Sequence, residues 1–293
     1  MSTMDLDPDL KTLMLSWQKT EITEHYIYSN LAKAVKDPHN RQIIEQIAAQ
    51  EAEHAATFKS FTNIEVKPNR WLIFVYYWIA RIFGLTFGVK LMERGEEGAQ
   101  AAYTTVSQRI PEVERIFKEE EEHEEQLLAM LDEEALRYAG SVVLGLNDAL
   151  VELTGALAGL TFAFQNTSLI AFTGLITGIS AAFSMAASEY LSARAEEQET
   201  NPLKAAIYTG IAYIFTVLIL VLPYLILKNY MICLIWTLVN AILVIAAFNF
   251  YIAVVKGLNF ARRFLEMAVI SLGVAAFSFG VGIFIRKFFG LEV

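Results

Sequence analysis

Two short strings in the first half of the chain place a carboxylate and an imidazole three residues apart: Glu51-x-x-His54 and Glu120-x-x-His123. On a helix, residues at this spacing project from the same face. Glutamate oxygens and histidine nitrogens together suit ferrous or manganous ions, and carboxylates can bridge two such ions and offset their repulsion. The two strings therefore predict a metal site between helices.

Three further glutamates extend this set of ligands. Glu21 precedes the first string, and Glu93 and Glu96 lie between the two strings. Inward-facing glutamates and two E-x-x-H pairs on four helices form the ligand set of a carboxylate-bridged di-iron bundle.

Each motif also has a plainer interpretation when it is taken alone. The run 119–125 is typical of a solvated acidic face, and a single E-x-x-H pair is common on surface helices. Two pairs on different helices, with glutamates on the other two, favour the di-metal interpretation.

Four helices are expected to position these groups. Asp37-Pro38 ends the first, because proline discourages helix continuation in the residue before it, and Pro111 begins the fourth. The expected ranges are about 7–36, about 40–62, a region that passes through Glu93 to about 108, and about 111–137.

The apolar stretch 71–89 is nearly long enough to span a bilayer. A crossing here would separate the first two helices from the last two and destroy the metal site, and Arg81 disfavours insertion. We expect a crossover followed by the start of the third helix. Its aromatic residues suit either a partner subunit or membrane interface, or an ordinary bundle core. These residues are Trp71, Tyr76, Tyr77 and Trp78.

Charge divides the 293-residue chain, which is 55% hydrophobic, into two parts. Residues 1–135 contain 24 acidic and 14 basic residues, a net charge of −10, whereas residues 136–293 contain 8 and 9, a net charge of +1. This shift predicts two domains, 1–135 and 136–293. An acidic domain attracts cations and repels nucleic acid. Residues 1–11 do not have the pattern of a secretory signal peptide, and a single cysteine, Cys233, excludes intramolecular disulfides and cysteine-rich metal sites.

The second part contains five apolar segments of the length that a bilayer requires. Six basic residues in the connections lie on the side of the N-terminal domain and three lie opposite, which predicts a cytosolic N-terminal domain and an external C-terminus in the cell membrane. The expected spans are about 139–163, 168–192, 205–227, 231–255 and 264–286.

Polar side chains inside these segments are costly in a bilayer and are usually functional. Asp148 and Glu152 lie one helical turn apart in the first segment, which suits a cation path or a proton relay. The second segment contains Met185, whose sulfur favours transition metals, and Glu189 near its cytosolic end. Alone, Met185 is typical of a core filler, whereas the two carboxylates have no comparably good structural explanation.

The motifs of the first part resemble those of the ferritin-like, rubrerythrin-type (erythrin) family over about residues 8–135. The resemblance implies a di-iron site, with manganese as the alternative. Since no rubredoxin-like cysteine module follows, peroxidase chemistry with a built-in electron donor is not supported. The implied ligands are Glu21, Glu51, His54, Glu93, Glu96, Glu120 and His123.

The second part is similar to the vacuolar iron transporter family in the strings 145–152, 155–159 and 184–190. The resemblance implies five helices per protomer, a homodimer, and exchange of divalent metal for protons along a path that includes Asp148 and Met185. The glutamate-rich insertion of some members is reduced here to the connection 194–204.

The joined chain resembles the membrane-bound ferritins of bacteria and archaea, which are implicated in iron export. We therefore predict an all-α protein, a ferritin-like four-helix bundle followed by a five-helix transmembrane bundle, that exports Fe²⁺ or Mn²⁺. Protons, membrane lipid and a second copy of the chain are the expected partners. The alternative is a membrane-anchored di-iron oxidase or peroxidase, or a metal sensor without turnover. Ferroxidase activity in the first domain is compatible with the leading hypothesis.

Overall fold

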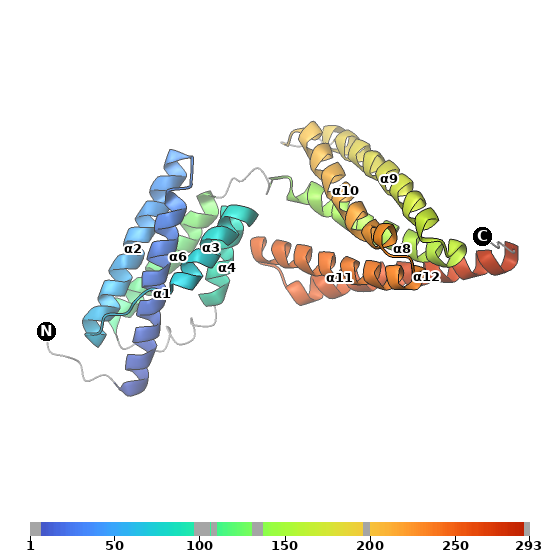
Figure 1. The fold of residues 1–293 in the computed structure, drawn as a ribbon. Helices are drawn as coiled ribbons and strands as arrows, with labels where there is room; N and C mark the ends of the chain where they lie inside the picture. Colours follow the sequence, from blue (N-terminus) through green and yellow to red (C-terminus); the bar gives the residue numbers. More distant parts are fainter. Residues whose placement is uncertain (1–6, 97–105, 107–109, 131–136, 196–199, 290–293) are drawn as a thin grey trace. The chain divides into compact units, whose positions relative to one another are not determined.

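A computed structural model describes residues 7–96, 106, 110–130, 137–195 and 200–289. The described residues form ten α-helices and no strand (Figure 1), which confirms the all-helical prediction. The chain divides into two compact units, Met1–Glu133 and Glu134–Val293.

The first two helices of the N-terminal unit, α1 (Pro8–Ala32) and α2 (Pro38–Thr62), pack along one another (Figure 1). Helix α2 begins earlier than residue 40, because proline fits the first helical turn, where no backbone N–H partner is needed. The Asp37 side chain caps this turn by accepting a hydrogen bond from the Asn40 backbone N–H at 2.9 Å.

The stretch expected as a crossover is instead a helix, α3 (Arg70–Phe83), and the expected third helix begins as α4 (Leu85–Glu96). Gly84 separates them with φ 99°, a conformation that residues with a side chain rarely adopt. Gly88 lies against Ala80, and an added Cβ would come within 2.6 Å of the Ala80 Cβ. Two glycines therefore turn one apolar stretch into a pair of packed helices.

The aromatic residues of α3 are divided between its two faces. Tyr76 and Tyr77 pack against the apolar core, whereas Trp71 and Trp78 are exposed. Neither sequence-based interpretation, interface or core, holds for all four residues.

Helix α6 (Pro111–Met130) completes the described part of the unit. Two apolar clusters lie along α1, α2 and α6. One contains Ile27, Ile44 and Leu127, and the other contains Trp17 and Phe58. Between them in sequence, each of the three helices carries acidic or histidine residues that are buried or partly buried.

The described residues of the C-terminal unit form five long helices. All five are long and apolar enough to cross a membrane, in agreement with the predicted number of candidate spans. Helix α8 contacts each of the other four and so forms the centre of the bundle. The helices are α8 (Ala139–Phe164), α9 (Thr167–Ala195), α10 (Pro202–Ile226), α11 (Tyr230–Val255) and α12 (Phe260–Phe289).

Glycines allow α8 to approach its neighbours closely. Gly145 lies against the backbone carbonyl of Thr209 in α10, and Gly159 lies against Ser278 and Gly282 in α12. Small residues at such contacts are typical of helix packing in membranes, where dispersion contacts between backbones replace the hydrophobic driving force.

Candidate functional site

Four acidic and histidine residues from three helices come together inside the N-terminal unit. Glu21 of α1, Glu51 and His54 of α2, and Glu120 of α6 each offer a ligand atom, and these atoms all lie within 4.8 Å of one another. Glu21, Glu51 and His54 are almost completely buried, at 3%, 1% and 0% exposure. These four residues all belong to the ligand set that the sequence implied, and their binding of a metal stays a prediction.

The histidine of the second motif lies beside this group. The His54 and His123 rings stack with their centroids 5.7 Å apart. His54 Nδ1 lies 2.8 Å from Glu120 Oε1 and 3.5 Å from Glu21 Oε2, and His123 Nδ1 lies 3.3 Å from Glu51 Oε1. Both histidines therefore direct Nδ1 toward the carboxylates.

Glu51 and Glu120 each divide their two oxygens between the two histidines. Glu51 directs Oε1 to His123 and Oε2 to His54, at 3.3 and 3.6 Å. Glu120 directs Oε1 to His54 and Oε2 to His123, at 2.8 and 3.5 Å. Two carboxylates between two imidazoles, with one oxygen toward each, are arranged as bridging ligands of a metal pair would be.

Several of these close contacts are not aligned hydrogen bonds. Within the described part of the chain, Glu51 Oε2, His54 Nδ1, Glu120 Oε1 and His123 Nδ1 are buried without a hydrogen-bond partner of acceptable geometry. Buried polar atoms in such a state are costly. Their short distances and poor mutual angles suit atoms that converge on a common ligand, and a cation among them would satisfy them.

The opposite nitrogens of the two rings are held by residues that the sequence analysis did not assign. His54 Nε2 donates to Glu119 Oε2 at 2.8 Å, and His123 Nε2 donates to Gln50 Oε1 at 3.0 Å. Such bonds fix which ring nitrogen faces a metal and orient the ring.

These two partners occupy equivalent places in the two motifs. Gln50 directly precedes Glu51 and holds the histidine of α6, and Glu119 directly precedes Glu120 and holds the histidine of α2. The repeated five-residue pattern, a carboxylate or amide followed by E-x-x-H, was visible in the sequence. It was missed because Glu119 begins the run that looked like a solvated face.

Burial and neighbouring charge shift the pKa values of the two buried glutamates in opposite directions. Burial raises the pKa of Glu21, and the nearby His54 imidazole only partly offsets this. Burial also acts to raise the pKa of Glu51, but the close imidazoles of His123 and His54 outweigh it and lower the pKa to about 2. The difference follows from the number of histidines that each carboxylate faces.

The pKa values of the histidines move upward. Burial acts to lower the pKa of both, but carboxylates outweigh it, first among them Glu120. The pKa of His123 rises to about 9, and that of His54 rises further. In the metal-free protein, protons on the two rings therefore offset the charge of the carboxylates, and a bound cation would replace those protons.

Glu93 and Glu96 lie in α4, but their side chains are outside the part of the structure that is described. Their role as ligands stays a prediction.

A second set of carboxylates lies in the membrane-type helices. Tyr213 of α10 donates to Glu152 Oε2 at 2.9 Å, and Ser141 of α8 donates to Glu189 Oε1 of α9 at 2.6 Å. Met185 packs at the edge of the apolar core. The sequence did not reveal Tyr213 and Ser141 as partners, because each bond joins two different helices and corresponds to no short-range spacing in the sequence.

Asp148 and Glu152 differ from the N-terminal carboxylates in their surroundings. Asp148 is half-buried and Glu152 is exposed on the surface of the single chain. Neither forms an ion pair with any residue that the structure describes. The predicted path residues therefore have hydroxyl partners or none, rather than cationic ones.

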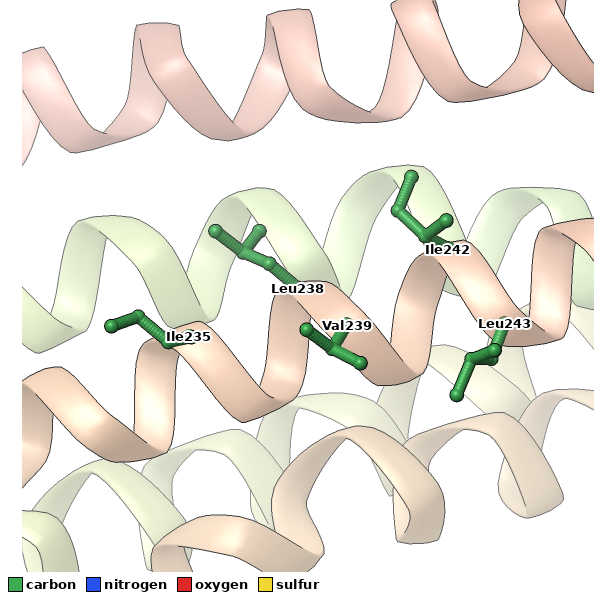
Figure 2. Close-up of a pocket in the computed structure, with 5 residues that line it drawn as sticks. All are labelled: Ile235, Leu238, Val239, Ile242 and Leu243. Atoms are coloured by element: carbon green, nitrogen blue, oxygen red, sulfur yellow. The ribbon is translucent and has the colours of Figure 1, made fainter.

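A depression on α11 offers no cation ligand. It has a volume of about 330 Å³ and is lined by apolar side chains from this one helix (Figure 2). Such a surface suits lipid chains. The lining residues are Ile235, Leu238, Val239, Ile242 and Leu243.

Comparison with known families identifies the C-terminal region alone. The model of the VIT family matches residues 139–200 and 195–283, the region that contains the membrane-type helices. No curated protein and no solved structure matches the chain. The match supports the resemblance inferred for this half, and together with the five apolar helices it indicates a membrane protein.

Proposed function

We propose that this protein exports divalent iron from the cytosol in exchange for protons, with manganese as the alternative cargo. The observation that carries the proposal is the pair Asp148 and Glu152, one turn apart in a membrane-type helix within the region that matches the VIT family. Ionised groups in a bilayer are retained at a cost, and cation transport is a function that requires them.

These carboxylates suit reversible binding. An ionised Asp148–Glu152 pair attracts a divalent cation, and protonation of the pair on the outer side favours release. Tyr213 orients Glu152 through its hydroxyl without contributing a positive charge that would repel the cargo. Transport requires a site that binds well enough to load and weakly enough to unload.

A second copy of the chain would cover the polar surface of α8 and α9. Glu152 is exposed on the single chain, and α9 exposes four small hydroxyl residues at helical spacing: Thr177, Ser180, Ser184 and Ser188. A carboxylate and a row of hydroxyls are poorly suited to face lipid chains. We therefore propose a homodimer with the path at the interface.

The N-terminal unit is proposed to hold a metal pair on the cytosolic side. Glu51, Glu120, His54 and His123 would hold the ions, and Glu21 would be a further ligand. Bound iron would supply one-electron redox chemistry. The residues present fit such a pair because their unsatisfied buried atoms converge.

The cytosolic orientation rests on the distribution of basic residues. Six lie in the segments on the side of the N-terminal unit, and three lie opposite. The first group is Arg137, Arg194, Lys204, Lys256, Arg262 and Arg263.

Transport by the reconstituted full chain tests the proposal. Liposomes containing a metal-quenched dye and an imposed pH gradient would receive Fe²⁺ without oxygen. We expect gradient-dependent quenching that Asp148→Asn abolishes and that Glu45→Gln, at an exposed position of α2, leaves intact. Transport by Asp148→Asn at the parent rate would refute the path assignment.

A membrane-anchored oxidase is the rival function, favoured by the bridging arrangement of Glu51 and Glu120. It is tested by oxygen consumption on addition of Fe²⁺. Consumption lost in His54→Ala but kept in His39→Ala, an exposed histidine, would assign turnover to this site. Equal consumption in both variants would leave a sensing or delivery role.

A further inference from the structure

Helix α3 presents an apolar face that no described part of the N-terminal unit covers. Trp71, Phe74, Trp78 and Ile82 are 69%, 56%, 48% and 68% exposed. Their spacing of three or four residues puts them on one side of the helix. Trp71 stacks on Phe74, and Phe74 meets Trp78 edge to face, so the aromatic side chains form a continuous row.

The opposite face of α3 fixes this orientation. Ile73, Tyr76, Tyr77 and Ala80 pack against the core formed with α1, α2 and α4. Rotation of α3 to bury the tryptophans would expose these residues, so the outward face is a stable property of the unit.

The charges around this face are all positive. Lys67, Arg70 and Arg81 are exposed, and the chain contains no acidic residue between Glu65 and Glu93. None of the three basic residues pairs with an acidic group in the described part of the molecule. This is unusual in a domain whose net charge is −10.

We propose that α3 docks on the surface of a bilayer that contains anionic phospholipid. An in-plane membrane helix combines an apolar face rich in tryptophan with basic residues at its edges. Basic residues near such a surface are attracted by anionic headgroups. Only residues 131–138 separate the N-terminal unit from α8, a helix suited to cross a membrane. This short tether raises the effective concentration of the bilayer surface near α3.

Pairing of α3 with its own copy fits the charges less well. A two-fold contact sets identical surfaces against each other, so Arg70 and Arg81 would meet basic residues with no acid in α3 to pair with them. The lipid surface supplies the missing negative charge. This inference does not depend on the transport proposal.

The test uses the full chain in lipid nanodiscs. Cys233→Ser removes the native thiol, and Ile82→Cys provides an attachment point for a polarity-sensitive dye while keeping all three aromatic residues of the row. Ser60→Cys, at an exposed position of α2, is the matched control. We expect a blue-shifted dye at position 82, quenched by spin-labelled lipid, in discs rich in phosphatidylglycerol, and an aqueous dye at position 60.

Charge reversal sharpens the test. Lys67→Glu with Arg70→Glu should lower the docked-to-undocked ratio at position 82 by about tenfold or more, because each basic residue contributes to the attraction. Replacement of the anionic lipid by phosphatidylcholine should act in the same direction. A dye at position 82 that stays aqueous in anionic discs would overturn the proposal. A dye at position 82 that is shielded from water regardless of lipid charge, together with disulfide formation between the introduced thiols of two copies, would also overturn it.

Discussion

The carboxylates of the two units differ in what offsets their charge. In the N-terminal unit, Glu51 and Glu120 face two histidines inside a buried cluster. In the membrane-type unit, Glu152 has a tyrosine hydroxyl as its partner, and Asp148 has no ion pair among the described residues. A buried set of many ligands favours tight, lasting binding, whereas a few exposed or half-buried carboxylates favour exchange. We infer that one unit holds metal and the other passes it on.

Loss of Glu51, which faces both histidines, should have the largest effect on metal binding. Glu51→Ala removes oxygens that face both histidines, so the Fe²⁺ affinity of the N-terminal unit should fall by more than about a hundredfold. This loss should exceed the one caused by removing a hydrogen-bond partner of a histidine. Glu53→Ala, exposed on the same helix, is the control. Anoxic equilibrium dialysis of the full chain measures both variants, and equal affinities would contradict the assignment.

Loss of Glu119, the hydrogen-bond partner of His54 Nε2, should lower the metal affinity of the same site by a smaller factor. Glu119→Ala frees His54 Nε2 and should weaken metal binding by about 10–100-fold. It should also alter the ligand-field spectrum of bound Co²⁺, which a purely structural role would not do. Glu122→Ala, in the same acidic run but exposed, should leave the spectrum unchanged.

In the membrane-type unit, the hydroxyl partner of Glu152 should affect transport alone. Tyr213→Phe removes one hydrogen bond to a carboxylate, so we expect Fe²⁺ flux to fall by about tenfold. Metal bound to the N-terminal unit should stay constant. Tyr208→Phe, a tyrosine of α10 that stacks on Tyr138, serves as the control. A change in bound metal without a change in flux would reverse the proposed roles.

The metal affinity of the N-terminal unit should fall as the pH is lowered. In the metal-free protein the pKa of His123 is about 9 and that of His54 is raised further, so both rings are protonated at pH 7. A metal ion must displace these protons, and its apparent affinity should therefore fall by about tenfold per displaced proton for each pH unit of acidification. Proton release on metal addition, followed in weak buffer, measures this. No release at pH 7 would show that the rings are already neutral.

The sequence was sufficient to predict features that depend on local spacing. The E-x-x-H pairs pointed to Glu51, His54 and Glu120, which lie together with Glu21 in the structure. The length of the apolar segments indicated the five helices suited to cross a membrane. The stretch expected as a crossover is instead the helix α3, and its end at Gly84 escaped prediction because one glycine within an apolar run is compatible with a continuous helix or with a break.

Contacts between helices were harder to predict. The bonds from Glu119 to His54 and from Tyr213 to Glu152 depend on how each helix is rotated against its neighbour. That rotation is set by packing of the surrounding apolar residues, not by the spacing of the polar ones.

The most direct test measures flux and bound metal in one preparation. Parent, Asp148→Asn and Glu51→Ala proteins would be reconstituted in liposomes, and anoxic Fe²⁺ transport and the metal retained per chain would be determined together. We expect Asp148→Asn to lose transport and keep its bound metal, and Glu51→Ala to lose the bound metal. Full transport by Asp148→Asn, or bound metal that depends on Asp148 rather than Glu51, would contradict this expectation.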